Sequence, residues 1–102
     1  MKNLILVVGC QGSGKSTLAS NLLAQHLASK IGIFAHKIPE NAQNLGEKFS
    51  AILIEEVSSI KELETIATTM TPSEVQVIVT SQKPINEFSN TVLASYDIVM
   101  HP

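Results

Sequence analysis

The sequence predicts an α/β fold built on a five-stranded parallel sheet. Its 102 residues contain five short apolar runs, separated by helical patterns or polar segments. Strands that alternate with helices call for parallel pairing with right-handed crossovers. The first run is almost continuously apolar, which is typical of a strand covered on both faces. A chain of this length, 44% apolar, buries one modest core, so we expect a single domain over residues 1–102.

The first strand is expected over residues 3–8, and a glycine-rich segment follows it. From Ser16 onward, apolar residues recur at the spacing of a helix: Leu18, Ala19, Leu22, Leu23 and Leu27. We expect this helix to continue until Gly32, because glycine is a common C-terminal stop. A short second strand is expected over residues 31–35.

Residues 39–50 are mostly polar, with one expected helical turn near Leu45. The third strand is expected over residues 51–54 and leads into two glutamates. Ser59 and Glu62 form a capping-box pattern, which predicts the start of a helix. One face of that helix is apolar: Ile60, Leu63, Ala67 and Met70.

The last part of the chain continues the alternation. A fourth strand is expected over residues 75–80 and a fifth over residues 97–100. Between them, Ile85, Phe88 and Val92 have helical spacing and predict one more helix.

The segment from Gly9 to Ser16 reads G-x-x-x-x-G-K-S and lies between the first strand and the first helix. Backbone N–H groups of such a turn can surround a polyphosphate, and the N-terminus of the next helix points at the same charge. The pattern therefore predicts a phosphate-binding loop, or P-loop, for a nucleoside triphosphate. The residues expected to contact the nucleotide are Gly9, Gln11, Gly12, Ser13, Gly14, Lys15, Ser16 and Thr17.

Four of the expected site residues have distinct chemical roles. Lys15 is expected to reach the β- and γ-phosphates, and Ser16 to hold Mg²⁺, so ATP and Mg²⁺ are the predicted ligands. Glu55 and Glu56 follow the third strand, at the edge where open α/β sheets bind ligands. We assign Glu55 to the metal and Glu56 to activation of the attacking water. The alternative is that both are solvated charges at the end of a strand.

A carboxylate that follows the metal-binding acid resembles one branch of the P-loop NTPases, in which an additional strand lies between the P-loop strand and the acidic strand. The resemblance implies a three-layer fold with sheet order 5-1-4-3-2. It also implies a polar sensor of the γ-phosphate after the fourth strand, where this chain has Thr80, Ser81 and Gln82. We assign Gln82 to that catalytic role; the alternative is that these residues only form a polar turn.

Thr80, Ser81, Gln82, Lys83 and Pro84 together resemble a sequence of the FtsK and HerA class of DNA-pumping ATPases, to which phage packaging and extrusion ATPases are related. The resemblance implies ATP hydrolysis in viral or plasmid DNA packaging or translocation. Those motors carry further segments for ring assembly and DNA contact, for which 102 residues leave little room.

Charge and composition limit the partners that we expect. The net charge is −2 and the seven lysines are scattered, so a DNA partner receives no support from a basic surface. The single cysteine, Cys10, suits a reducing compartment, which predicts the cytoplasm, or the host cytoplasm for a viral protein. No apolar run approaches the roughly 18 residues of a membrane span.

The chain contains no arginine, although an arginine finger commonly accelerates phosphoryl transfer by roughly 10³ to 10⁵. Hydrolysis is therefore expected to be slow unless a partner protein supplies the cation. In a homo-oligomer only Lys83 stands at the corresponding place, and the alternative is a solvated lysine. A non-catalytic nucleotide-binding module that assembles with a larger partner is a second hypothesis. A small-molecule or nucleotide kinase needs a lid and an acceptor site, usually rich in arginine, and neither the length nor the composition provides them. A kinase and a regulatory GTPase therefore fit the sequence less well than an ATPase.

Overall fold

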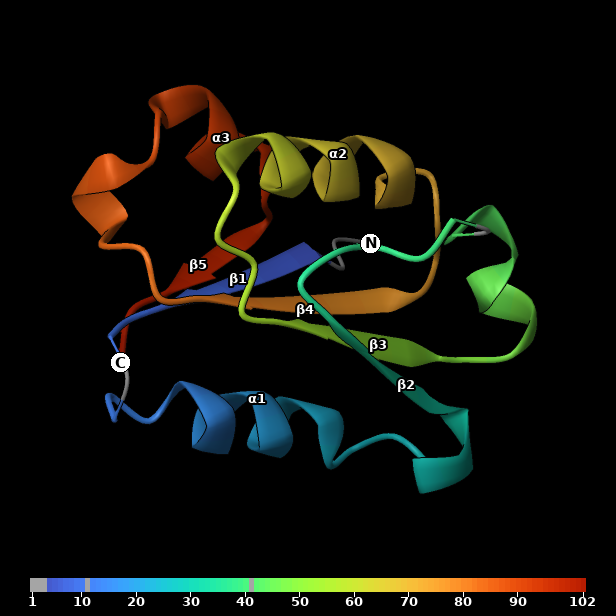
Figure 1. Ribbon diagram of the computed structural model, residues 1–102. Coiled ribbons are helices and arrows are strands. Elements are labelled where there is room, and N and C mark those ends of the chain that lie inside the picture. The colour runs from blue at the N-terminus through green and yellow to red at the C-terminus, as the bar shows by residue number, and fades with distance from the viewer. Residues whose placement is uncertain (1–3, 11, 41) are drawn as a thin grey trace.

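The computed structural model describes residues 4–10, 12–40 and 42–102. Within them, one parallel sheet is covered by α1 on one face and by α2 and α3 on the other (Figure 1). The strands are β1 (Leu4–Val8), β2 (Ile31–Ala35), β3 (Ala51–Glu55), β4 (Gln76–Ser81) and β5 (Ile98–Met100). The helices are α1 (Lys15–Leu23), α2 (Ile60–Met70) and α3 (Asn90–Ser95), with short 3₁₀ segments η1 (Ala28–Lys30), η2 (Ala42–Glu47) and η3 (Ile85–Glu87). None of the helices so described is long and apolar enough to cross a membrane.

The five strands lie in the order β2-β3-β4-β1-β5. Read from the β5 edge, this is the expected order 5-1-4-3-2. β4 therefore separates β1 from β3, and its last residue, Ser81, lies beside Val8 at the end of β1. The chain segments that follow β1, β3 and β4 consequently meet at one edge of the sheet, where we expect the functional site.

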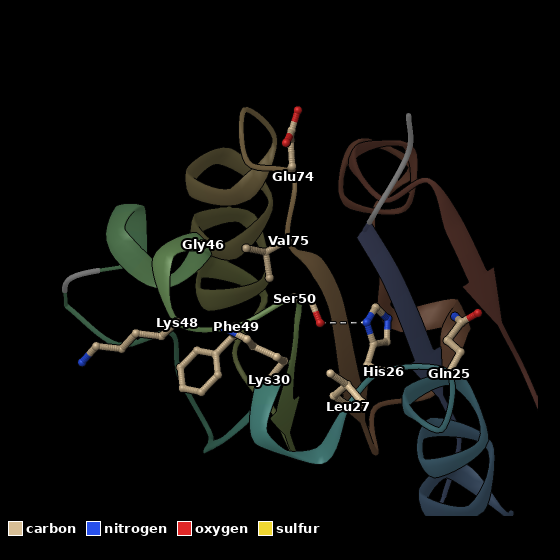
Figure 2. A pocket seen from close by; sticks show the side chains of 10 residues that line it. All are labelled: Gln25, His26, Leu27, Lys30, Gly46, Lys48, Phe49, Ser50, Glu74 and Val75. Atoms are coloured by element: carbon tan, nitrogen blue, oxygen red, sulfur yellow. Dashed lines mark hydrogen bonds between the residues drawn. The ribbon is translucent and has the colours of Figure 1, made fainter.

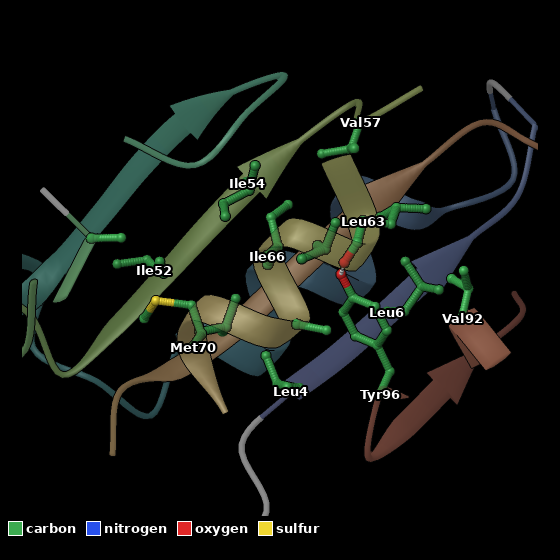
Figure 3. Close-up of a cluster of buried hydrophobic side chains, with 14 of the residues drawn as sticks. Leu4, Leu6, Ile52, Ile54, Val57, Leu63, Ile66, Met70, Val92 and Tyr96 are labelled. Atoms are coloured by element: carbon green, nitrogen blue, oxygen red, sulfur yellow. Dashed lines mark hydrogen bonds between the residues drawn. The ribbon is translucent and has the colours of Figure 1, made fainter. Parts of the chain in front are cut away.

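Side chains of β1 alternate between two apolar clusters. Leu4, Leu6 and Val8 belong to the larger cluster, under α2 and α3 (Figure 3). Ile5 and Val7 belong to the smaller cluster, which includes Ala19 and Leu23 of α1. All five residues of β1 are buried, which confirms the prediction of a strand covered on both faces.

The N-terminus of α2 forms half of the predicted capping box. The Ser59 hydroxyl accepts a hydrogen bond from Glu62 N–H at 3.3 Å. The Glu62 carboxylate accepts from Ile38 N–H at 3.0 Å and so ties the segment after β2 to α2. Farther along α2, the Tyr96 hydroxyl donates to the Leu63 carbonyl at 2.8 Å (Figure 3). Burial raises the pKa of this Tyr96 hydroxyl above its ordinary value.

Two predicted helices are shorter in the structure. α1 ends at Leu23, whereas the sequence predicted a helix until Gly32. Gly32 lies in β2, and a Cβ on it would be 3.0 Å from the Phe49 ring, so its small size serves packing and not a helix end. The predicted helix through Ile85 and Val92 is divided into η3 and α3, because the Ser89 hydroxyl accepts from Val92 N–H at 3.2 Å and starts a new helix.

Candidate functional site

The loop between β1 and α1 requires glycine at several positions. Gly14, which precedes the first residue of α1, has φ 95°, and Gly12 has φ 84°. Both lie in the left-handed region, which side chains with a Cβ disfavour. A Cβ on Gly9 would overlap the Ser13 hydroxyl oxygen. The glycines of the predicted pattern are thus explained by the backbone path. Gln11, predicted to contact the nucleotide, lies outside the described residues.

The first backbone N–H groups of α1 have no carbonyl acceptor within the helix. The first hydrogen bond of α1 is donated by Leu18 N–H to the Gly14 carbonyl at 3.0 Å, so the N–H groups of Lys15, Ser16 and Thr17 precede the intrahelical series. Among residues 4–10, 12–40 and 42–102, no side chain caps this helix start. In the described part of the chain, the Ser13 hydroxyl is also buried without a hydrogen-bond partner. Uncapped N–H groups at a helix start attract anions, so the loop fits an oxyanion such as phosphate.

A hollow of about 570 Å³ opens beside this loop. The residues that line it are Gly12, Gly14, Lys15, Ser16, Thr17, Glu56 and Gln82. They come from the glycine-rich loop, the start of α1 and the ends of β3 and β4. All seven residues were predicted for the site, and the fold brings them together in one hollow.

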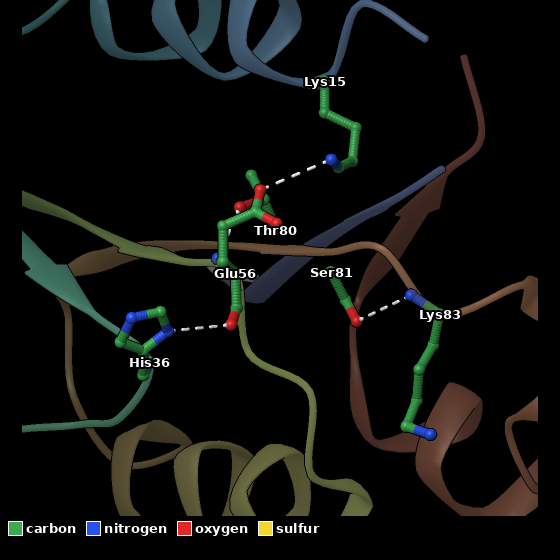
Figure 4. A network of polar contacts seen from close by, with 6 residues as sticks. All are labelled: Lys15, His36, Glu56, Thr80, Ser81 and Lys83. Atoms are coloured by element: carbon green, nitrogen blue, oxygen red, sulfur yellow. Dashed lines mark hydrogen bonds and ion pairs between the residues drawn. The ribbon is translucent and has the colours of Figure 1, made fainter. Parts of the chain in front are cut away.

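Lys15 and Glu56 form an ion pair across this hollow. The Lys15 ammonium lies 3.3 Å from the Glu56 carboxylate, and the Lys15 side chain is 6% exposed (Figure 4). A buried ammonium requires a partner, and Glu56 supplies it. A bound polyphosphate would offer Lys15 a more highly charged partner at the same place.

The backbone of Glu56 explains how its side chain reaches Lys15. Strand alternation would place Glu56 on the face of Ile54, which packs in the cluster under α2. Glu56 instead has φ 57°, which turns the chain out of the strand pattern. Its N–H donates to the buried Thr80 hydroxyl at 3.0 Å, and Val57 N–H donates to the Thr80 carbonyl at 2.9 Å. Thr80 therefore holds the turn that directs Glu56 toward α1.

Glu55, the predicted metal ligand, is exposed at the end of β3 and is not among the residues that line the hollow. Its carbonyl accepts from His36 N–H at 2.8 Å. Among the described residues, no group of three His, Cys, Asp or Glu side chains could hold a metal ion. Mg²⁺ in nucleotide sites needs only one or two protein ligands besides phosphates and water. The hydroxyl of Ser16, which lines the hollow, suits such a site.

The three polar residues after the fourth apolar run take different positions. Thr80 and Ser81 are buried, and the Ser81 hydroxyl accepts from Lys83 N–H at 3.3 Å. Gln82 is exposed and lines the hollow, so it is the member of this segment placed to meet a ligand. The Lys83 ammonium lies 3.9 Å from the Glu87 carboxylate, and its side chain runs away from Glu56 (Figure 4).

His36 is a residue of this region that the sequence did not indicate. It follows β2, has φ 70°, and its Nδ1 donates to the Glu56 carbonyl at 3.2 Å (Figure 4). The contact depends on the parallel pairing of β2 with β3, which places Ala35 beside Glu55. Only the register of these strands could have revealed it.

A further hollow of about 640 Å³ lies near the N-terminal ends of β3 and β4, at the opposite edge of the sheet (Figure 2). His26, predicted within the first helix, lies beyond its end. The Ser50 hydroxyl donates to His26 Nδ1 at 3.0 Å, and His26 Nε2 donates to the Gln76 side-chain oxygen at 2.6 Å. His26 thus links the segment after α1 to both strands, which contributes to the early end of that helix.

Comparison with known proteins gave no relative: no protein-family model matches the chain, and no curated protein is significantly similar to it. The evidence for function is therefore the arrangement of the residues themselves.

Proposed function

We propose that the chain binds a Mg²⁺-nucleoside triphosphate in the hollow at the start of α1 and hydrolyses it slowly. ATP is the nucleotide that we propose. The observation that carries the proposal is the uncapped start of α1 behind a glycine-rich turn, with the buried Lys15 held by one carboxylate across the hollow. A helix start and an ammonium that face the same space suit a chain of phosphates.

Most of the lining residues then have a role, and so does Glu55 beside them. The N–H groups of Lys15, Ser16 and Thr17 would bind phosphate oxygens, and the Lys15 ammonium would reach the β- and γ-phosphates. Ser16 would hold Mg²⁺, which when bound neutralises charge on the phosphates; Glu55 is the proposed second ligand, through water. Gln82 would orient the attacking water beside the γ-phosphate.

Glu56 would act as the base, and nucleotide binding would make it available. In the present structure its carboxylate is paired with Lys15. Phosphates that take over Lys15 would leave this carboxylate without its cation, next to the position of the γ-phosphate. A carboxylate placed in this way can accept a proton from water as the water attacks phosphorus.

The absence of arginine from these 102 residues supports slow turnover unless a partner protein donates a cation. The same absence favours a second candidate function, a nucleotide-binding module that works within a larger assembly. Because of the resemblance to DNA-pumping ATPases, we propose viral or plasmid DNA packaging or translocation as the process. Because a net charge of −2 does not favour DNA binding by this chain, we propose that a partner protein would contact the DNA.

Calorimetry with Mg²⁺-ATP tests the binding proposal. Lys15→Ala should lower the affinity by roughly 30-fold or more, because it removes a buried charge that the phosphates would pair with. Lys30→Ala, which removes an exposed lysine at the opposite edge of the sheet, is the matched control and should bind like the parent. Equal affinity of folded Lys15→Ala and parent would contradict the proposal. Tight binding with no Mg²⁺-dependent phosphate release, with or without DNA, would favour the module.

A further inference from the structure

A smaller hollow of about 430 Å³, here called the second hollow, adjoins the first hollow, which is the one of about 570 Å³ beside the glycine-rich loop. It is lined by His36, Glu56, Val57, Ser58, Gln82 and Lys83, and it shares Glu56 and Gln82 with the first hollow. A molecule in the second hollow would therefore lie beside the proposed base and beside the residue assigned to the γ-phosphate.

The size of this hollow exceeds what hydrolysis requires. One attacking water occupies about 30 Å³ of liquid volume, a small fraction of the space. Sites for small molecules commonly start at about 300 Å³. The volume therefore suits a second substrate as well as water.

The polar groups of the second hollow include several hydrogen-bond acceptors. His36 Nδ1 donates to the Glu56 carbonyl, and in the neutral tautomer that matches this bond Nε2 is an acceptor. The Glu56 carboxylate and the Gln82 amide oxygen are further acceptors. The Lys83 ammonium is directed to Glu87. Acceptors of this kind match a ligand with several hydroxyl donors.

Backbone strain is concentrated at the same place. Among the described residues, the non-glycine residues with positive φ are His36 and Glu56. Such conformations are unfavourable for residues with a Cβ, and they persist at functional sites. Both residues line the second hollow, and the His36 ring is bonded to the Glu56 carbonyl.

Although the sequence, which lacks arginine, favoured an ATPase over a small-molecule kinase, we propose that the second hollow is an acceptor site for a small polyhydroxy compound, to which the chain transfers the γ-phosphoryl group. This inference rests on the proposed nucleotide binding. A hydroxyl oxygen of the acceptor forms a bond to the γ-phosphorus, and the bond from that phosphorus to the β,γ-bridging oxygen breaks. Glu56 takes the hydroxyl proton, and ADP leaves with the electron pair of the broken bond. Water at the same position gives inorganic phosphate.

Glycerol is the probe that tests the inference. With Mg²⁺-ATP and increasing glycerol, phosphorus NMR should show glycerol phosphate beside inorganic phosphate, and the ratio of the two products is the readout. Ser58→Phe should lower this ratio roughly tenfold or more by filling the acceptor space. Ser29→Phe, an exposed serine in η1, is the matched control and should keep the parent ratio. His36→Asn, which tolerates positive φ, should also lower the ratio.

Every result decides the inference. Inorganic phosphate as the sole product at all glycerol concentrations would overturn it, and so would a parent ratio in both Ser58→Phe and His36→Asn. Mg²⁺-ATP that binds in calorimetry but gives neither product overturns the acceptor site and leaves nucleotide binding intact. Mg²⁺-ATP that does not bind removes the proposed function and, with it, this inference.

Discussion

The two edges of the sheet carry hollows of comparable volume, about 640 Å³ at the N-terminal edge and about 570 Å³ at the start of α1, but their polar groups differ. At the N-terminal edge, both ring nitrogens of His26 are hydrogen-bonded within the protein. At the other edge, the Ser13 hydroxyl is buried and has no hydrogen-bond partner among the residues that the structure describes, and the backbone of Glu56 is strained. Polar groups left unsatisfied indicate a ligand better than volume does.

The largest effect is expected from Glu56→Gln. The amide keeps the size of the side chain but is a poor base, so turnover should fall by roughly 10²- to 10⁴-fold while Mg²⁺-ATP still binds. Glu55→Gln is the matched variant one residue away, and it should mainly raise the Mg²⁺ concentration required for turnover. Phosphate release and calorimetry measure both. Loss of turnover in Glu55→Gln alone, at unchanged Mg²⁺ requirement, would show that the two roles are reversed.

A large loss of stability is expected at the opposite edge, from His26→Ala. The substitution leaves Ser50 and Gln76 without their ring partner, so the free energy of unfolding should fall by roughly 1–3 kcal/mol. Urea unfolding measures this change. Nucleotide affinity of the folded variant should equal that of the parent. A selective loss of affinity would show that the two edges are not separate in function.

Gly14→Ala should produce a smaller loss of stability at the glycine-rich loop before α1. A Cβ at φ 95° costs roughly 1–2 kcal/mol, and relief of the strain would displace the N–H groups that start α1. We therefore expect lower stability together with weaker Mg²⁺-ATP binding. Gly46→Ala is the matched control, because its Cβ would meet Val75 at an ordinary 3.5 Å. Wild-type binding by Gly14→Ala would contradict the assignment of the loop.

The smallest effect is expected from Lys83→Ala. The pair with Glu87 is partly exposed, and such pairs contribute about 0–1 kcal/mol to stability. Urea unfolding should therefore show a change within that range. The rate of Lys83→Arg per molecule should not depend on protein concentration, because residue 83 is directed to Glu87. A rate that rises with concentration would instead place residue 83 at a neighbouring molecule's site.

Much of the fold followed from local patterns. β2 has the predicted bounds, and β1 ends at Val8 as predicted. β3 and β5 differ from prediction by one residue at one end, and β4 by one residue at each end. Patterns of this kind report which side chains are buried, and burial decides where a strand forms. The predictions for the end of α1 and for a single helix over residues 85–95 were wrong. Gly32 is needed for packing against the Phe49 ring, His26 bonds to residues beyond α1, and the Ser89 cap starts a separate helix.

The candidate site was predictable in part. The glycine-rich pattern specified the residues that the structure brings together around Lys15, since their spacing alone determines the loop. The orientation of Glu56 depends on a positive φ and on Thr80 of a neighbouring strand, which no local pattern indicates. His36 belongs to this region through strand register alone. Binding and catalysis by these residues stay predictions until they are measured.

The position of β1 has a consequence for how the chain folds. Its ladder partners are β4 and β5, so Leu4 pairs with Val77 and Ile5 with Ile98. Long loops must close before these contacts can form, and the conformational entropy lost in closing them makes folding slow. During synthesis, the apolar first strand therefore has no ladder partner until β4 has been made. The glycine-rich loop that follows it acquires its shape only after that point, and until then the exposed apolar strand is a suitable ligand for chaperones.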